Sequence, residues 1–315
     1  MTSHGGVSAL LLLRTPLQAW IARSVLCAEQ VDIFDLVYFT EDDSAEDRAY
    51  FRQLATRANA AQYVFVPRKK FSLATQAEFR KRTYRWFKSQ AYDLVLLASI
   101  DAYIPAAIAA RQAGTLITFD DGTANINRTS SYFQVSSGLR ELLYRRYFGA
   151  PSIVSLRDKS VRHYTLHPEL PNIVERPRLR AVRGWLKNDS ARACRGCKTY
   201  FLGQPFDDVL TRKQRFRLES YLRHLSIDFY VKHPRENKVL RIGVPLLQKG
   251  GMIAEDAIVK DAGEYGINLI GGFSSALFNL AAVAQRRTML VFGNSAQTRA
   301  QVQLAKQVGC EVKEI

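Results

Sequence analysis

An apolar run in the first half of the chain, residues 116–119, ends in two adjacent carboxylates, Asp120 and Asp121. Three residues that favour turns or offer hydrogen bonds follow: Gly122, Thr123 and Asn125. If the run is a parallel strand, the two acids lie at its carboxyl end, where ligands bind in open α/β sheets. Adjacent carboxylates could hold a metal ion, orient a sugar hydroxyl or act as a general base. The alternative is an ordinary Asp-Asp-Gly turn.

A second pair of acids, Asp207 and Asp208, follows the apolar run of residues 199–202, after Gly203 and a proline. This pair also stands at the end of an expected strand. The alternative is that the acids cap the helix expected after them.

The third motif is FYVKHPREN, in which a strand leads into His233 and Pro234. The proline favours an extended backbone at the histidine. With Lys232 and Arg235 beside it, His233 could hydrogen-bond a phosphate and donate a proton to it, and the alternative is a surface histidine. His167–Pro168 repeats the dipeptide, but we expect no strand to lead into it.

The fourth motif is LIGGFSSALFNLA, in which a strand and a glycine turn precede Ser274 and Ser275. The serines fall where a helix is expected to start, so their hydroxyls and the unpaired N–H groups of the first turn could bind an anion. The alternative is simple N-capping.

These motifs are connected by short apolar runs that alternate with longer helical patterns. In the first half we expect strands at residues 7–13, 33–38, 63–66, 94–99 and 116–119, and helices at 16–29, 44–59, 73–89 and 103–113. In the second half we expect strands at 199–202, 229–231, 241–244, 268–270 and 288–292, and helices at 211–224, 255–260, 274–285 and 297–308. Ser44, with Asp47 three positions on, predicts an N-cap.

Alternation of this kind predicts the α/β class, with parallel sheets covered by helices on both faces. The 315 residues suit two domains. We expect them at residues 1–180 and 196–315, facing a central cleft, with a charged linker at about 176–195. Two such domains indicate a nucleotide-using enzyme.

The first apolar run is too short to span a bilayer, which takes about 20 residues. It lacks a basic leader and a cleavage site and is followed by Arg14 and Pro16, so we expect a buried strand in a cytoplasmic protein rather than a signal peptide. Cys194 and Cys197 form a C-x-x-C. No second pair accompanies it, although a zinc site needs about four ligands, so we expect reduced thiols and no metal site.

The net charge of +16 is concentrated in three clusters, at residues 69–88, 140–146 and 176–198. No nucleic-acid-binding motif accompanies them. An anionic membrane surface is therefore favoured over nucleic acid as the partner, and the alternative is a solvated basic face.

The motifs, in this order, resemble those of the bacterial sialyltransferases of glycosyltransferase family 52. The resemblance covers most of the chain and runs through LLASIDAYIPAAIAA, TFDDGTANI, SIVSLRDKSVRHYTL, FLGQPFDD, YVKHPRE, PLLQKGGMIAEDAI and GGFSSAL. It implies a GT-B-like fold of two Rossmann-type domains around a cleft, with an acceptor-side N-terminal domain and a donor-binding C-terminal domain. It also implies a homodimer.

The resemblance implies inverting transfer of sialic acid from CMP-sialic acid to a galactose-type hydroxyl of lipooligosaccharide or lipopolysaccharide, with no cofactor or metal. Asp207 is the first choice for the general base and Asp208 the second, because the matching family stretch, GSPD, is one residue shorter before the acid. Asp121 competes for this role, and His233 would act on the donor phosphate. The other implied donor contacts are Gly203, Pro234, Arg235, Glu255 (to the ribose), Ser274 and Ser275. The implied contacts on the sugar or acceptor side are Asp120, Gly122, Thr123 and Asn125.

Three other functions stay open. Lys232 and Arg235 could neutralise the diphosphate of a UDP-sugar, which would make the chain a hexosyltransferase of the same family. A capsule could replace lipooligosaccharide as the acceptor. A non-catalytic polyanion-binding protein is the most distant alternative. The expected partners are a nucleotide sugar and a bacterial surface glycan, with peripheral contact at the inner face of the cytoplasmic membrane.

Overall fold

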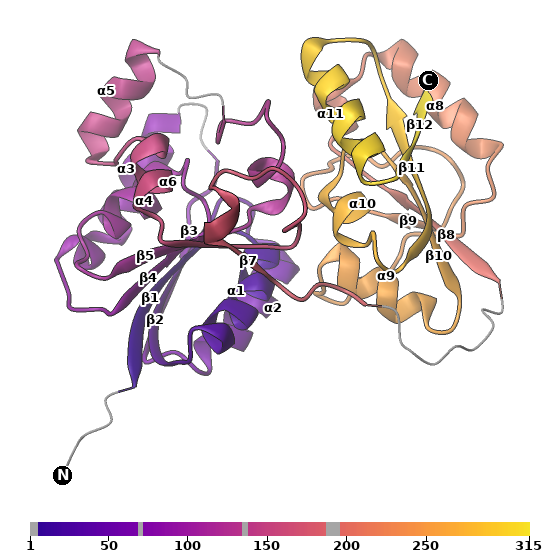
Figure 1. Ribbon diagram of the computed structural model, residues 1–315. Coiled ribbons are helices and arrows are strands. Elements are labelled where there is room, and N and C mark those ends of the chain that lie inside the picture. Colours follow the sequence, from indigo (N-terminus) through magenta and orange to yellow (C-terminus); the bar gives the residue numbers. More distant parts are fainter. Residues whose placement is uncertain (1–5, 69–71, 134–137, 187–195) are drawn as a thin grey trace. The chain divides into compact units, whose positions relative to one another are not determined.

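The computed structural model describes residues 6–68, 72–133, 138–186 and 196–315 (Figure 1). The chain divides into two compact units, Met1–Arg183 and Gly184–Ile315. Each unit contains one parallel sheet with helices packed against it, as the alternation of apolar runs and helical patterns predicts.

The sheet of the first unit has seven parallel strands in the order β3-β2-β1-β4-β5-β6-β7. They are β1 (Val7–Leu13), β2 (Val31–Thr40), β3 (Ala60–Phe65), β4 (Leu94–Leu97), β5 (Thr115–Phe119), β6 (Arg162–Thr165) and β7 (Leu179–Ala181). The strand order reverses between β1 and β4. A reversal of this kind opens a crevice at the carboxyl ends of the two strands, and ligands bind in such crevices.

The helices of this unit are α1 (Pro16–Ala28), α2 (Ala45–Ala55), α3 (Ser72–Arg82), α4 (Tyr103–Ala109), α5 (Leu139–Phe148) and α6 (Ile153–Lys159). Three short 3₁₀ turns accompany them: η1 (Tyr84–Phe87), η2 (Gly122–Asn125) and η3 (Arg176–Arg178). Helices α1 and α2 cover one face of the sheet, and α3 to α6 cover the other (Figure 1). The predicted cap of α2 is confirmed, because Ser44 and Asp47 form a reciprocal capping box.

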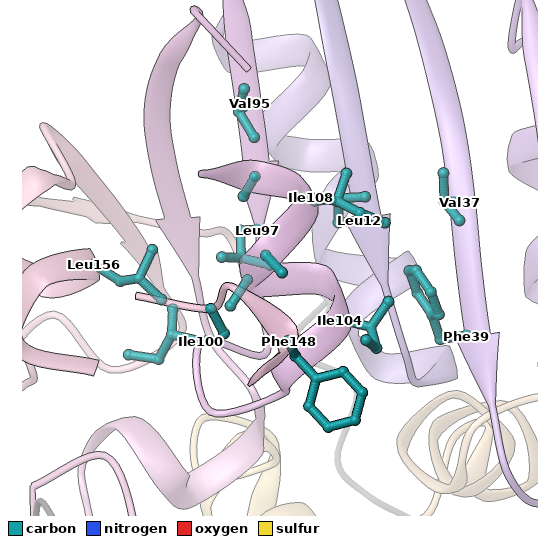
Figure 2. Close-up of a cluster of buried hydrophobic side chains, with 14 of the residues drawn as sticks. Leu12, Val37, Phe39, Val95, Leu97, Ile100, Ile104, Ile108, Phe148 and Leu156 are labelled. Carbon is teal, nitrogen blue, oxygen red and sulfur yellow. The ribbon is translucent and has the colours of Figure 1, made fainter. Parts of the chain in front are cut away.

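One hydrophobic cluster of the first unit lies between the sheet and α4. Figure 2 shows Leu12, Val37 and Leu97 of the strands beside Ile104 and Ile108 of α4, and all five side chains are buried. The continuous run of leucines in β1 is buried on both faces of the sheet, as is usual for a central parallel strand. Burial on both faces explains why the run shows no alternation with polar residues.

The sheet of the second unit has five parallel strands in the order β12-β11-β10-β8-β9. They are β8 (Cys197–Leu202), β9 (Phe229–Val231), β10 (Gly266–Gly271), β11 (Ala284–Val291) and β12 (Glu311–Glu314). The helices are α7 (Phe206–Val209), α8 (Arg212–Arg223), α9 (Ala254–Ala262), α10 (Ser275–Asn279) and α11 (Ala296–Gln307). The order reverses between β8 and β10, so this unit has its own switch point.

Neighbouring residues of β8 bind helices on opposite faces of this sheet. Phe201 packs in a cluster with Leu218 and Leu222 of α8. The hydroxyl of Tyr200 donates a hydrogen bond of 2.7 Å to the Asp261 carboxylate of α9. Helix α8 therefore covers one face and α9 the other.

The expected linker at 176–195 is wrong in its first part. Residues 176–181 form η3 and the edge strand β7, which pairs with β6, and the units separate between Arg183 and Gly184. Strand β7 is short and bears a charged residue, so its sequence looks like a connection. Residues 187–195, which include Cys194, lie outside the described residues.

Several expected elements also differ. The helix expected at 274–285 ends at Asn279, and Gln285 already belongs to β11, whose second to fifth residues are polar. Residues 241–244 are not a strand. A strand does precede His167–Pro168, contrary to expectation. This strand, β6, was not predicted because its sequence, Arg-His-Tyr-Thr, has no apolar run. Its buried histidine and threonine are satisfied by a polar network in the sheet interior.

Candidate active site

The predicted site residues of the second unit follow three adjacent strands. The strand order β10-β8-β9 puts the loop after β8 between the loops after β10 and β9. These loops carry Gly203 to Asp208, Gly272 to Ser275 and Lys232 to Glu236. The sequence motifs therefore converge at the carboxyl edge of this sheet, next to its switch point.

Two contacts bind these loops together. The N–H of Gly203 donates to the carbonyl of Val231 over 2.9 Å, and the side-chain amide of Gln204 donates to the carbonyl of Phe273 over 2.9 Å. A Cβ on Gly203 would collide with the Glu236 carboxylate and the Tyr230 ring. The close approach of these residues therefore favours glycine at this position.

His233 is held in one orientation by its own turn. The N–H of Arg235 donates to Nδ1 of His233 over 3.0 Å, so Nδ1 acts as an acceptor. In the neutral imidazole the proton then resides on Nε2. The N–H of the neutral His233 ring is therefore on the ring edge away from its backbone turn.

Glu236 supports this turn from inside the protein. Its carboxylate accepts from the Tyr230 hydroxyl and from the N–H of His233, the latter over 3.3 Å. The side chain is buried, and burial raises the pKa of Glu236. Glu236 is part of the YVKHPRE motif, but the sequence alone did not assign it a function. A carboxylate three positions after the histidine is the signal that could have identified it.

Asp207 and Asp208 lie in the short helix α7, and both are exposed. Asp207 forms an ion pair with the guanidinium of Arg215 on α8. Neither acid caps α8, because Thr211 does so in a capping box with Gln214. The capping alternative for the acid pair is therefore wrong for this helix.

Ser274 occupies the N-cap position of α10, but its hydroxyl makes no capping hydrogen bond. Because α10 has only five residues, its dipole contributes little at this end. The anion-binding role expected for Ser274 and Ser275 therefore depends on hydroxyl and N–H groups. Below them, Asn279 of α10 donates to the buried Glu255 of α9 over 2.8 Å, and burial raises the pKa of Glu255.

In the first unit, the neighbours Asp120 and Asp121 have different environments. Asp120 is buried at 1% exposure and accepts from the hydroxyl of Thr165 over 2.9 Å and the N–H of Leu166 over 2.7 Å. Its other oxygen lies 3.1 Å from Nε2 of His163. Asp120 is thus fully engaged in joining β5 to β6.

Asp121 follows β5, and its side chain contacts residues after β1 and after β4, the two strands of the switch point. Its carboxylate accepts from Gln18 of α1 over 2.6 Å, from Ser99 after β4 over 3.2 Å and from the Tyr132 hydroxyl over 2.9 Å. Asn125 accepts from the backbone N–H of Asp121 over 2.7 Å and is buried, so its role is to shape this turn. Gly122 adopts φ 61°, which favours glycine.

A small cavity of about 150 Å³ opens at this edge of the first sheet. Its polar lining includes Arg14 after β1, Asp101 after β4 and Gln76 of α3. Burial and the nearby charge of Asp121 raise the pKa of the Asp101 carboxyl. Sequence reasoning missed Asp101, which occurs in the quoted segment LLASIDAYIPAAIAA one residue after an apolar stretch.

The predicted residues therefore form two groups, one at the switch point of each unit. Asp121, Gly122, Thr123 and Asn125 belong to the first, and Asp120 supports it from the sheet interior. No group of three or more His, Cys, Asp or Glu side chains that could hold a metal ion occurs in the part of the chain that the structure describes. In the same part, no helix is long and apolar enough to cross a membrane.

Comparisons with known proteins give the family. The model of glycosyltransferase family 52 matches residues 34–291. A CMP-N-acetylneuraminate:beta-galactoside alpha-2,3-sialyltransferase of Pasteurella multocida is 27% identical over 86% of this chain and 86% of its own. An N-acetyllactosaminide alpha-2,3-sialyltransferase of Neisseria meningitidis is 26% identical over 80% of this chain and 69% of its own.

Solved structures show the same architecture. The glycosyltransferase SnogD from Streptomyces nogalater has a TM-score of 0.52 over 98% of this chain and 87% of its own, with 13% identity. This similarity and the two parallel α/β units confirm the expected GT-B class.

Proposed function

The chain belongs to glycosyltransferase family 52, and from this premise we propose that it transfers sialic acid from CMP-sialic acid to a galactose-type hydroxyl of a bacterial surface glycan. The observation that carries the proposal is the likeness, over at least 80% of the chain, to two enzymes named as alpha-2,3-sialyltransferases, one of which has CMP-N-acetylneuraminate and a beta-galactoside in its name. The proposed linkage is α-2,3, as in both names. Lipooligosaccharide or lipopolysaccharide is the proposed acceptor.

The donor binds to the second unit. Its phosphate lies beside His233, whose Nε2–H donates to a phosphate oxygen, and beside the hydroxyls of Ser274 and Ser275. Glu255 accepts from the ribose hydroxyls, and Arg235 adds positive charge. CMP-sialic acid carries one phosphate, so the charge that develops on leaving CMP needs less neutralisation than that of a diphosphate. On this account these groups suffice without a metal ion.

Transfer then proceeds by inversion. The acceptor oxygen bonds to the anomeric carbon of sialic acid while the bond from that carbon to the phosphate oxygen breaks and its electron pair leaves with CMP. Asp207 takes the proton from the acceptor hydroxyl, and its ion pair with Arg215 fixes the carboxylate. Each acid–base group of this kind contributes roughly 10²- to 10⁴-fold in rate.

In the first unit we assign Asp121 and the adjoining 150 Å³ cavity to acceptor-side sugar recognition. Carboxylates such as Asp101 and Asp121 accept hydrogen bonds from sugar hydroxyls, and Arg14 offers donors. Asp120 supports this group through β5 and β6 rather than by touching sugar.

The test is a transfer assay with a fluorescent galactose-terminated acceptor, CMP-sialic acid and EDTA. We expect a product with one added sialic acid that a sialidase specific for α-2,3 linkages removes. Transfer that requires a divalent cation would overturn the metal-independent mechanism. A product that resists this sialidase but yields to a broad-specificity one would change the linkage and leave the donor assignment intact.

A further inference from the structure

Helix α5 presents its apolar side to solvent. Four large apolar side chains are exposed: Leu139 (71%), Leu142 (64%), Leu143 (53%) and Tyr147 (66%). Spacings of three, four and eight residues put them on one side of the helix. Together with Arg140 and Arg146, which are also exposed, they form a surface that we call the α5 face.

The opposite side of α5 is buried through both polar and apolar contacts, which fix the orientation of the helix. Arg145 is buried and pairs with Glu141 over 2.8 Å. Its guanidinium also donates to the carbonyls of Pro151 over 2.6 Å and Asp101 over 3.2 Å. Phe148 packs in the core of the unit. The helix cannot roll to bury its leucines without breaking these contacts, so the exposed leucines are a fixed property of the fold.

The surroundings of the α5 face are basic. Arg80 of α3 donates to the carbonyl of Tyr147 over 3.2 Å, and Lys81 and Arg82 follow it in the last turn of α3. The acids of these two helices are paired: Glu141 with Arg145, and Glu78 with Arg82. In Figure 1, α3 and α5 lie on the same side of the first sheet. The face thus combines exposed leucines with a net positive charge.

We propose that the α5 face binds the interfacial region of an anionic membrane. Apolar side chains flanked by arginines match the acyl boundary and the phosphates of such a surface. A second copy of the chain fits less well, because a two-fold contact through this face would bring arginines against arginines. A nucleic acid would use the arginines but leave the leucines in water. The inference goes beyond the proposed function and holds whichever nucleotide sugar is the donor.

The test is co-sedimentation of the full chain with vesicles of phosphatidylcholine alone and with about one third phosphatidylglycerol. We expect binding to the anionic vesicles only. The variant Leu139→Gln/Leu142→Gln/Leu143→Gln should lower the partition coefficient about tenfold or more, because it removes the inserted apolar area. Arg140→Gln/Arg146→Gln should lower it roughly fivefold per charge.

The matched control is Ile33→Gln/Val161→Gln/Phe216→Gln, which changes apolar side chains that are 51%, 46% and 66% exposed on other elements. It should bind vesicles like the wild type, and thermal melting should show all variants folded. An equal loss of vesicle binding in the control and in the leucine variant would overturn the proposal. The proposal would also be overturned if the protein did not bind vesicles and formed a dimer that the leucine variant dissociates. That result would assign the α5 face to a second copy of the chain.

Discussion

Asp120 and Asp121 are adjacent in sequence but have opposite roles in the structure. Side chains alternate across a strand end, so one carboxylate enters the sheet interior and the other faces the switch point. The pair could be predicted as a feature of the sheet edge. The different roles of the two carboxylates could not be predicted. They depend on contacts with β6 and the residue just after it, namely His163, Thr165 and Leu166.

At this scale we expect Asp120→Ala to lower the free energy of unfolding by about 3 kcal/mol, since it leaves buried donors without an acceptor. Urea denaturation measures this loss. The exposed Asp208→Ala serves as the control and should stay within about 0.5 kcal/mol of the wild type. Similar losses for the two variants would contradict the supporting role of Asp120.

The base assignment is tested by single substitutions in the second unit. We expect Asp207→Asn and His233→Ala each to reduce kcat by more than about 100-fold, with unfolding free energies near that of the wild type. Asp208→Asn should retain most activity. Near-normal turnover in Asp207→Asn, with loss in Asp208→Asn or Asp121→Asn, would move the base to the residue whose loss matters.

At the scale of elements, the buried strands and capped helices were predictable, because β1, β4 and β10 are apolar and α2 has its capping box. Strands β6, β7 and β11 were missed or displaced. Their polar residues are accommodated by sheet pairing and by contacts distant in sequence, which no local pattern reveals.

The approach of the loop after β8 to the residues around β9 gives a prediction at this scale. Gly203→Ala would drive a Cβ into the Glu236 carboxylate and the Tyr230 ring. We expect a loss of about 1 to 3 kcal/mol in unfolding free energy. We also expect a weaker donor site, because Glu236 holds the turn that orients His233. A variant with wild-type stability and donor KM would show that the loops can separate without consequence.

The contact between α9 and α10 predicts a pH dependence. Burial raises the pKa of Glu255, so the free protein binds this proton at a higher pH than an exposed carboxyl would. The ribose hydroxyls need the ionised form as acceptor, so protonation competes with the donor. The donor KM should therefore rise as the pH falls from about 8 to about 5.

Glu255→Gln should raise the donor KM about tenfold with little change in kcat, and its KM should vary little across this pH range. Asp256→Asn, which removes a neighbouring charge that helps to raise the pKa of Glu255, is the comparison variant and should shift the pH dependence toward lower pH without abolishing it. An unchanged pH dependence in Glu255→Gln would remove Glu255 from the ribose site.

For the whole molecule, the two-unit α/β organisation followed from the sequence because the strand–helix alternation restarts after the charged stretch. The units separate within the expected linker of residues 176–195, but the linker was expected to begin too early, since β7 adds an edge strand to the first sheet before Arg183. The high positive charge indicated an anionic partner. The charge pointed to residues 140–146 as one of three basic clusters, but it did not indicate the exposed leucines of α5, because a helix with its leucines turned outward has the same sequence pattern as one with its leucines buried.

The central claim is that CMP-sialic acid is the donor, and the most direct measurement is nucleotide release without an acceptor. The purified protein is given CMP-sialic acid or one of several UDP-sugars, in EDTA, and the released nucleotide is identified. We predict slow release of CMP alone, abolished in His233→Ala. Release of UDP with no CMP would contradict the claim, because Lys232, Arg235 and the serines would then serve a diphosphate in a hexosyltransferase.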